Sequence, residues 1–223
     1  MTNQLNKLQN HIQGEISEFK EQYWKPYQIK IGQWWLRTMG WRMEGVLPKL
    51  QKYLVVGAPH TAKRDVPIFL ASMLASGRRL NWLTADIAMR FPYRKFMINH
   101  GAIIIPYKQR HGGVDKAVEL FTKLENFALA VAPEGNIYKT DYWKSGFYHI
   151  AQGANVPIVL LSGDFKEKIL RFSPPFELSG DIKEDMDRVR EFFCNVTAKY
   201  PERAAPIRLR AEENPEQLPE DES

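Results

Sequence analysis

Two polar side chains follow an apolar run near residue 55, and their types are suited to acid–base chemistry. The run YLVVGAP ends at Pro59 and is followed by His60, with Asp65 five residues further on. A histidine can act as a general base near neutral pH, and a carboxylate can orient its ring and stabilise the protonated form. The commonest use of aspartate before an apolar helical run is as a helix N-cap, so the spacing alone is a weak signal.

Two more polar clusters follow apolar runs. Lys108 and Arg110 come after AIIIPY, and Glu134 and Gly135 come after FALAVAP. Lysine and arginine are suited to binding a phosphate oxyanion. Glu134 could hydrogen-bond either an acceptor hydroxyl or the backbone of the histidine loop, and a glycine permits close approach of a ligand. Taken singly, both clusters also fit ordinary solvated turns.

The elements that must position these clusters alternate along the chain. Strands are expected at 43–47, 53–58, 80–85, 102–107, 127–133 and 157–163. Helices are expected between them, at 65–76, 86–99, 114–126 and 145–154. KILRF and FELS are expected to pair as terminal strands before a helix at about 183–199. This alternation predicts an α/β fold with a largely parallel sheet flanked by helices. Because such sheets bind ligands beyond the carboxyl ends of their strands, we expect the three clusters to converge.

The two ends of the chain differ from this middle part. Residues 3–23 and about 27–39 show the apolar stripes of amphipathic helices, and the second carries Trp34 and Trp35 beside basic residues. Residues 1–40 are therefore expected either to lie on a membrane surface or to pack on the main domain, which we place at 41–200. Residues 201–223 are predicted to form an acidic, disordered tail.

The distribution of charge points to an anionic partner. The formal net charge is +5, but the last thirteen residues hold six acids and no lysine or arginine. The remainder has 31 basic and 20 acidic residues. A membrane surface, a phosphorylated substrate or nucleic acid would fit such a body, and nucleic acid is the weakest of these because no recognition motif is present. No apolar run reaches the ~18 residues of a spanning helix, so any membrane contact is expected to be peripheral.

Four blocks taken in order carry a more specific signal. APHTAKRD, GAIII, APEGN and WKSGFYHIAQGANVPIV resemble the successive motifs of the glycerolphosphate and lysophosphatidate acyltransferase family, in a bacterial subgroup, with an H-x4-D motif at His60 and Asp65. The resemblance covers about residues 40–170. It implies that His60, oriented by Asp65, deprotonates an acceptor hydroxyl that attacks a fatty acyl thioester of coenzyme A or acyl carrier protein. It implies substrate-binding roles for Glu134, Gly135, Lys108, Arg110 and Lys144.

The same resemblance implies that no metal and no further cofactor is needed. No covalent acyl-enzyme is expected either, which fits the absence of a G-x-S-x-G nucleophile motif. Backbone N–H groups of the loop after His60 are expected to stabilise the oxyanion. The implied protein is a cytoplasmic enzyme of phospholipid biosynthesis, peripheral at the inner face of the cell membrane.

Two departures from the family pattern affect the acceptor. The P-E-G turn continues with Asn-Ile-Tyr at 136–138 where the family has Thr-Arg-Ser, and Pro-Tyr at 106–107 stand where it has Asp-Arg. Either Lys108, Arg110 and Lys144 bind the phosphate instead, or the acceptor is not a lysophosphatidate. The leading acceptor is 1-acylglycerol-3-phosphate. The alternatives are another acceptor such as a lyso-aminolipid, or a non-catalytic lipid-binding module of the same fold.

Overall fold

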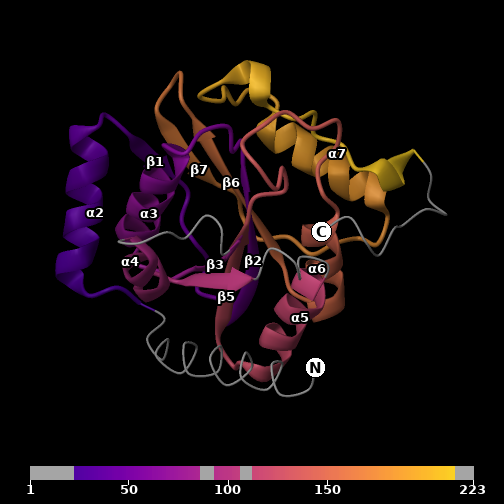
Figure 1. Ribbon diagram of the computed structural model, residues 1–223, viewed down its shortest axis with the longest axis horizontal. Coiled ribbons are helices and arrows are strands. Elements are labelled where there is room, and N and C mark those ends of the chain that lie inside the picture. Colours follow the sequence, from indigo (N-terminus) through magenta and orange to yellow (C-terminus); the bar gives the residue numbers. More distant parts are fainter. Residues whose placement is uncertain (1–22, 86–92, 106–111, 214–223) are drawn as a thin grey trace.

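A seven-stranded sheet lies at the centre of the computed structural model, which describes residues 23–85, 93–105 and 112–213 (Figure 1). The strands are β1 (Arg42–Glu44), β2 (Lys52–Ala58), β3 (Asn81–Ala85), β4 (Ala102–Ile105), β5 (Phe127–Val131), β6 (Ile158–Asp164) and β7 (Ile169–Phe172). Their order across the sheet is β1-β7-β6-β2-β5-β3-β4. Strands β2 to β6 run parallel to one another, so the predicted α/β fold with a largely parallel sheet is confirmed.

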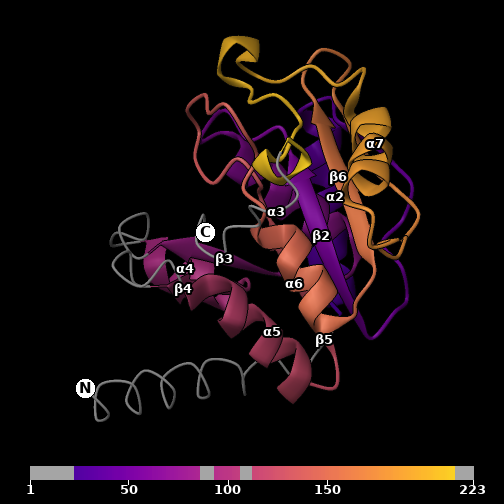
Figure 2. The same cartoon turned by 90° about the vertical axis from the view of Figure 1, so that its right-hand side faces the viewer.

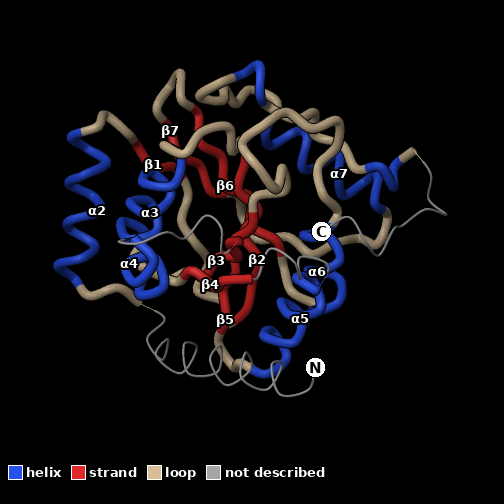
Figure 3. Tube along the Cα trace, viewed as in Figure 1, coloured by secondary structure: helices blue, strands red, loops and turns tan. Residues whose placement is uncertain are grey.

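Helices cover both faces of this sheet, as Figure 3 shows in blue and red. They are α2 (Pro26–Thr38), α3 (Asp65–Ser76), α4 (Tyr93–Asn99), α5 (Gly113–Lys123), α6 (Gly146–Ala154) and α7 (Ile182–Phe193). Leu54 and Val56 of β2 join the core formed with α5, α6 and α7, while Tyr53 and Val55 join the core formed with α2 and α3. Figure 2 shows α5, α6 and α7 together on the near side. Both faces of β2 are buried, which explains its continuous apolar run.

The predicted pairing of KILRF with FELS is wrong. Strand β7 pairs antiparallel with β6 and parallel with β1, while Phe176 of FELS makes an isolated bridge to Ile158 at the start of β6. Pro174 and Pro175 separate the two segments and have no N–H to donate, which disfavours continued strand pairing there.

Helix α2 packs closely against α3. A Cβ added to Gly32 would lie 2.6 Å from the backbone nitrogen of Ala75, so the glycine permits this approach. The opposite side of α2 exposes Tyr27, Ile31 and Trp34, each by more than half. The second predicted N-terminal helix thus packs on the domain through one side only. The first, at 3–23, lies outside the described residues.

The predicted disordered tail is wrong for residues 201–213, which pack on the domain. Two short 3₁₀ helices, η3 (Pro201–Arg203) and η4 (Arg210–Glu212), frame the fully buried Leu209. The acids that suggested disorder lie at 211–223, and residues 201–210 hold apolar side chains that reach the core. Residues 214–223 lie outside the described part. Within the described ranges, no helix is long and apolar enough to cross a membrane.

Candidate active site

The order of the strands brings two polar turns together. Strands β2 and β5 are neighbours, and their paired residues run from Lys52 opposite Phe127 to Val56 opposite Val131. His60 follows β2 and Glu134 follows β5 at nearly the same distance from that last pair. The two turns therefore meet at the carboxyl edge of the sheet, where ligands of open α/β sheets bind.

His60 and Asp65 are in direct contact. Nδ1 of His60 lies 3.2 Å from Oδ2 of Asp65, and the two side chains are 28% and 13% exposed. Asp65 is the first residue of α3, so the five-residue spacing spans the turn from β2 into this helix. A proton on Nδ1 facing the carboxylate leaves Nε2 as the basic nitrogen of the ring. The arrangement can therefore remove a proton from a hydroxyl group placed at Nε2.

Asp65 also binds the backbone of the turn that joins the two residues. Its Oδ2 accepts hydrogen bonds from the N–H groups of Thr61 and Ala62, both at 2.9 Å. These bonds fix the carboxylate that faces His60. They also occupy two of the amides expected to bind an oxyanion, which leaves the amides of Lys63 and Arg64 as candidates for that role.

Glu134 lies beneath the histidine turn and is almost fully buried, at 2% exposed. Its Oε1 accepts a hydrogen bond of 2.9 Å from the backbone N–H of His60. Of the two roles that the sequence left open for Glu134, the structure shows this one. Burial raises the pKa of Glu134, and the hydrogen bond from His60 offsets part of that effect. Its Oε2 has no partner among the described residues. A substrate-binding role for Glu134 stays a prediction.

Gly135 and Lys144 lie against each other in the next part of the site. Gly135 has a φ of 69°, a conformation that favours glycine. A Cβ at this position would lie 2.7 Å from Cε of Lys144. The Lys144 N–H donates to the carbonyl of Pro133 at 2.8 Å. The structure thus brings His60, Asp65, Glu134, Gly135 and Lys144 into one set of adjoining turns.

The other predicted cations, Lys108 and Arg110, lie outside the described residues. Lys63 and Arg64, to which the sequence assigned no role, are exposed on the histidine turn itself. Tyr200 also contacts the histidine turn, a contact that was not predicted from the sequence. The N–H of Tyr200 donates to Oγ1 of Thr61 at 3.2 Å, across a separation of 139 residues that no sequence pattern signals. No group of His, Cys, Asp or Glu residues suited to a metal ion occurs within the described ranges.

Comparison with known proteins gives a structural match. No family model matches the chain, and no curated protein matches it. Among solved structures, the chain is similar to the crystal structure of the 1-acyl-sn-glycerophosphate acyltransferase PlsC from Thermotoga maritima. The TM-score is 0.53 and the identity 16%, over 78% of this chain and 80% of that one. The shared feature is the α/β fold.

Proposed function

We propose that this chain is an O-acyltransferase that moves a fatty acyl group from a thioester donor to a hydroxyl of a lipid acceptor. One observation carries the proposal. The His60 ring contacts Asp65 at 3.2 Å at the end of the central strand β2, and it remains partly exposed. The similarity in fold to a 1-acyl-sn-glycerophosphate acyltransferase supports the same class of reaction.

The mechanism follows from the orientation of the ring. Nε2 of His60 takes the proton of the acceptor hydroxyl as its oxygen attacks the thioester carbonyl carbon, and Asp65 stabilises the imidazolium. The tetrahedral oxyanion is bound by amides at the turn before α3. When this intermediate collapses, the carbon–sulfur bond breaks, the ester is complete, and the thiolate takes the proton back from Nε2.

The acceptor that we propose first is a lysophospholipid, 1-acylglycerol-3-phosphate, with coenzyme A or acyl carrier protein as the carrier of the acyl group. Lys144 is the cation that the structure places against the Gly135 turn. We assign it, together with Lys108 and Arg110, to binding the phosphate. In this role the protein contributes to phospholipid biosynthesis.

A second acceptor class is favoured by the turn after Gly135. Oδ1 of Asn136 accepts a hydrogen bond from the N–H of Tyr138, and the Tyr138 ring is largely exposed. A turn-forming amide and an aromatic ring thus occupy this stretch, without an arginine. Such a turn suits a less anionic acceptor, such as a lyso-aminolipid.

Helix α2 supports action at a membrane surface. Tyr27, Ile31 and Trp34 form an exposed apolar stripe, and α2 contains Lys30 and Arg37 but no acid. Aromatic rings beside basic residues suit the interface of an anionic membrane. We therefore propose a peripheral enzyme at the inner face of the cell membrane.

The test of the reaction is thiol release from acyl-coenzyme A and acyl carrier protein with a panel of lyso-acceptors. We expect release that depends on the acceptor and collapses in His60→Ala. His100→Ala is the control. His100 comes just before the parallel strand β4, so it lies at the amino edge of the sheet, whereas His60 lies at the carboxyl edge. Absence of release with every pair, while vesicles are still bound, would reject catalysis in favour of a lipid-binding module.

The test of the membrane surface is co-sedimentation with anionic vesicles. We expect Trp34→Ser combined with Ile31→Ser to weaken binding, with the unfolding midpoint little changed because both side chains are exposed. Tyr138→Ser is the control, since it removes an equally exposed ring far along the chain. Equal loss in both variants would argue against α2 as the contact surface.

A further inference from the structure

The C-terminal segment, residues 195–213, contacts the histidine turn of the candidate active site and the loop that carries Lys144. It reaches the histidine turn through Tyr200 and the loop before α6 through Arg208. We infer that this segment positions the active-site turns, and that Arg208 is a positioning residue acting through the loop that carries Lys144. The expected change in acceptor KM rests on the proposed function, whereas the expected change in amide exchange of the loop does not.

Arg208 holds three consecutive residues of that loop. Its carbonyl accepts a hydrogen bond from the Trp143 N–H at 2.9 Å, and its Nε donates to the Asp141 carbonyl at 3.1 Å. Its guanidinium lies over the Tyr142 ring, 4.4 Å from the centroid. Contacts to three successive residues restrict both the path and the rotation of the loop.

The next residue along the loop belongs to the candidate site. Lys144 donates its N–H to Pro133, and its aliphatic stem covers Gly135. Trp143, which precedes it, has a buried ring in the main core. Any displacement of residues 141–143 is therefore passed directly to Lys144 and to the turn that carries Glu134.

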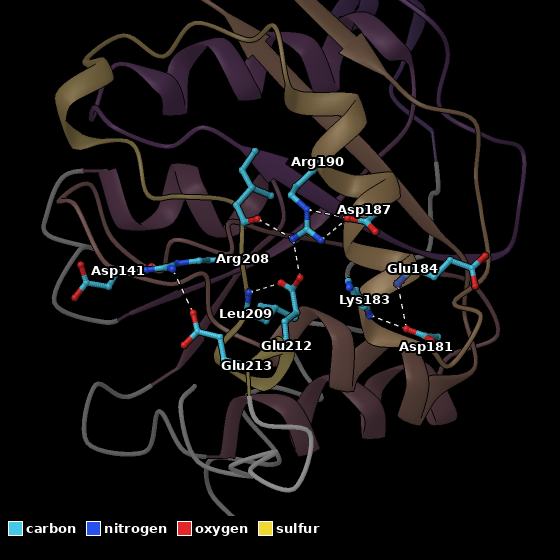
Figure 4. Close-up of polar contacts among 11 residues, drawn as sticks. Asp141, Asp181, Lys183, Glu184, Asp187, Arg190, Arg208, Leu209, Glu212 and Glu213 are labelled. Carbon is cyan, nitrogen blue, oxygen red and sulfur yellow. Dashed lines mark hydrogen bonds and ion pairs between the residues drawn. The ribbon is translucent and has the colours of Figure 1, made fainter.

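The segment is itself anchored to α7, as Figure 4 shows. Nη1 of Arg190 lies 2.7 Å from Oε2 of Glu212 and 3.2 Å from the carbonyl of Ile207. The other oxygen of Glu212 accepts a hydrogen bond of 2.7 Å from the Leu209 N–H. Leu209 is fully buried in the core shared with α6 and α7. Arg208 thus acts from a backbone that is fixed on both sides.

The same segment constrains the histidine side of the site. Tyr200 donates its N–H to Thr61, which is 1% exposed and whose own N–H binds Asp65. Earlier in the segment, the carbonyl of Thr197 accepts a hydrogen bond of 2.9 Å from Phe165, just after β6. One continuous segment therefore supports the acid–base pair and the lysine together.

Replacing Arg208 tests positioning of the loop without a large effect on the stability of the fold. Its side chain is 46% exposed and its polar contacts within the described ranges are to the Asp141 carbonyl and to Glu213, at 3.2 Å. Removing the guanidinium buries no new polar group and leaves Leu209 in place. The expected effect of Arg208→Ala is thus confined to the loop and the site.

The first experiment is hydrogen exchange on the full chain, residue by residue, for wild type and Arg208→Ala. We expect the amides of Trp143 and Lys144 to exchange about tenfold faster in the variant, the size expected for losing one hydrogen bond from a charged donor. Arg188→Ala is the control, since Arg188 is exposed on α7 and stacks on Phe176 instead. Exchange within twofold of wild type would overturn the inference.

The second experiment is a kinetic double-mutant cycle. Arg208→Ala is expected to raise the acceptor KM about tenfold and leave the donor KM unchanged, because the loop loses one hydrogen bond from a charged donor. In a Lys144→Ala background the same change should alter the acceptor KM less than threefold, because the side chain through which Arg208 acts is already absent. Effects that simply multiply would contradict positioning through Lys144. If wild type shows no transfer, the proposed function fails and exchange alone decides the inference.

Discussion

Replacing Asp65 with asparagine keeps the shape of the residue that faces His60 and removes its charge. Oδ2 accepts from Thr61 and Ala62 and contacts the ring, so an amide oxygen must stay there to keep both backbone bonds. The amide nitrogen then takes the place of Oδ1, a buried atom with no partner among the described residues. The variant therefore carries an unsatisfied N–H and a neutral partner for the histidine.

The size of both effects can be worked out from these contacts. A hydrogen bond to a charged group contributes about 1.5–3 kcal/mol and a neutral one about 0.5–1.5 kcal/mol, so weakening the two backbone bonds to Oδ2 should lower the free energy of unfolding by about 1–3 kcal/mol. A charge pair near 4 Å contributes about 4 kcal/mol at an effective dielectric constant of ~20. The His60 ring is 28% exposed, so we halve that value for solvent screening. About 2 kcal/mol of lost imidazolium stabilisation corresponds to a rate about 30-fold lower.

The assay is thiol release at saturating acceptor over a range of pH, together with urea unfolding of the same samples. Asp115→Asn is the matched control, because Asp115 is an exposed acid in the first turn of α5. We expect the control to behave as wild type in both measurements. A folded Asp65→Asn that transfers acyl groups within threefold of wild type would refute the assignment of Asp65 as the orienting acid.

Two further predictions concern the turn after β5. Burial raises the pKa of Glu134 above its ordinary value of 4.5, so the folded state binds this proton more tightly than the unfolded state. The stability that this group gives to wild type therefore falls as the pH rises from 4.5 through the raised pKa. Glu134→Gln cannot ionise, so its unfolding free energy relative to wild type should rise with pH over that window in urea titrations, and a flat difference would contradict the buried carboxyl. Gly135→Ala should lose about 1–2 kcal/mol for its left-handed backbone and should also raise the acceptor KM by displacing Lys144. Gly180→Ala, with a φ of 92° and no neighbour within 4 Å, should show the first effect alone.

Much of the site is local in sequence, and that part could be predicted. His60 and Asp65 are five residues apart and span one strand-to-helix turn, so the apolar run and the acid at the helix start predict their proximity. The apolar runs likewise predict the strands of the sheet, because both faces of β2 and β5 are buried and their sequences are therefore continuously apolar. These features follow from short-range geometry that is written in neighbouring residues.

Only the tertiary structure decided which distant turns meet. Glu134 binds the amide of His60 across 74 residues because β5 lies beside β2 in the sheet. The contacts of Tyr200 and Arg208 depend in the same way on where the C-terminal segment packs, and its acidic composition indicated disorder instead. Strand order and segment packing depend on the free energy of burying whole faces against each other, and this free energy is a property of the assembled core that no single stretch of residues contains.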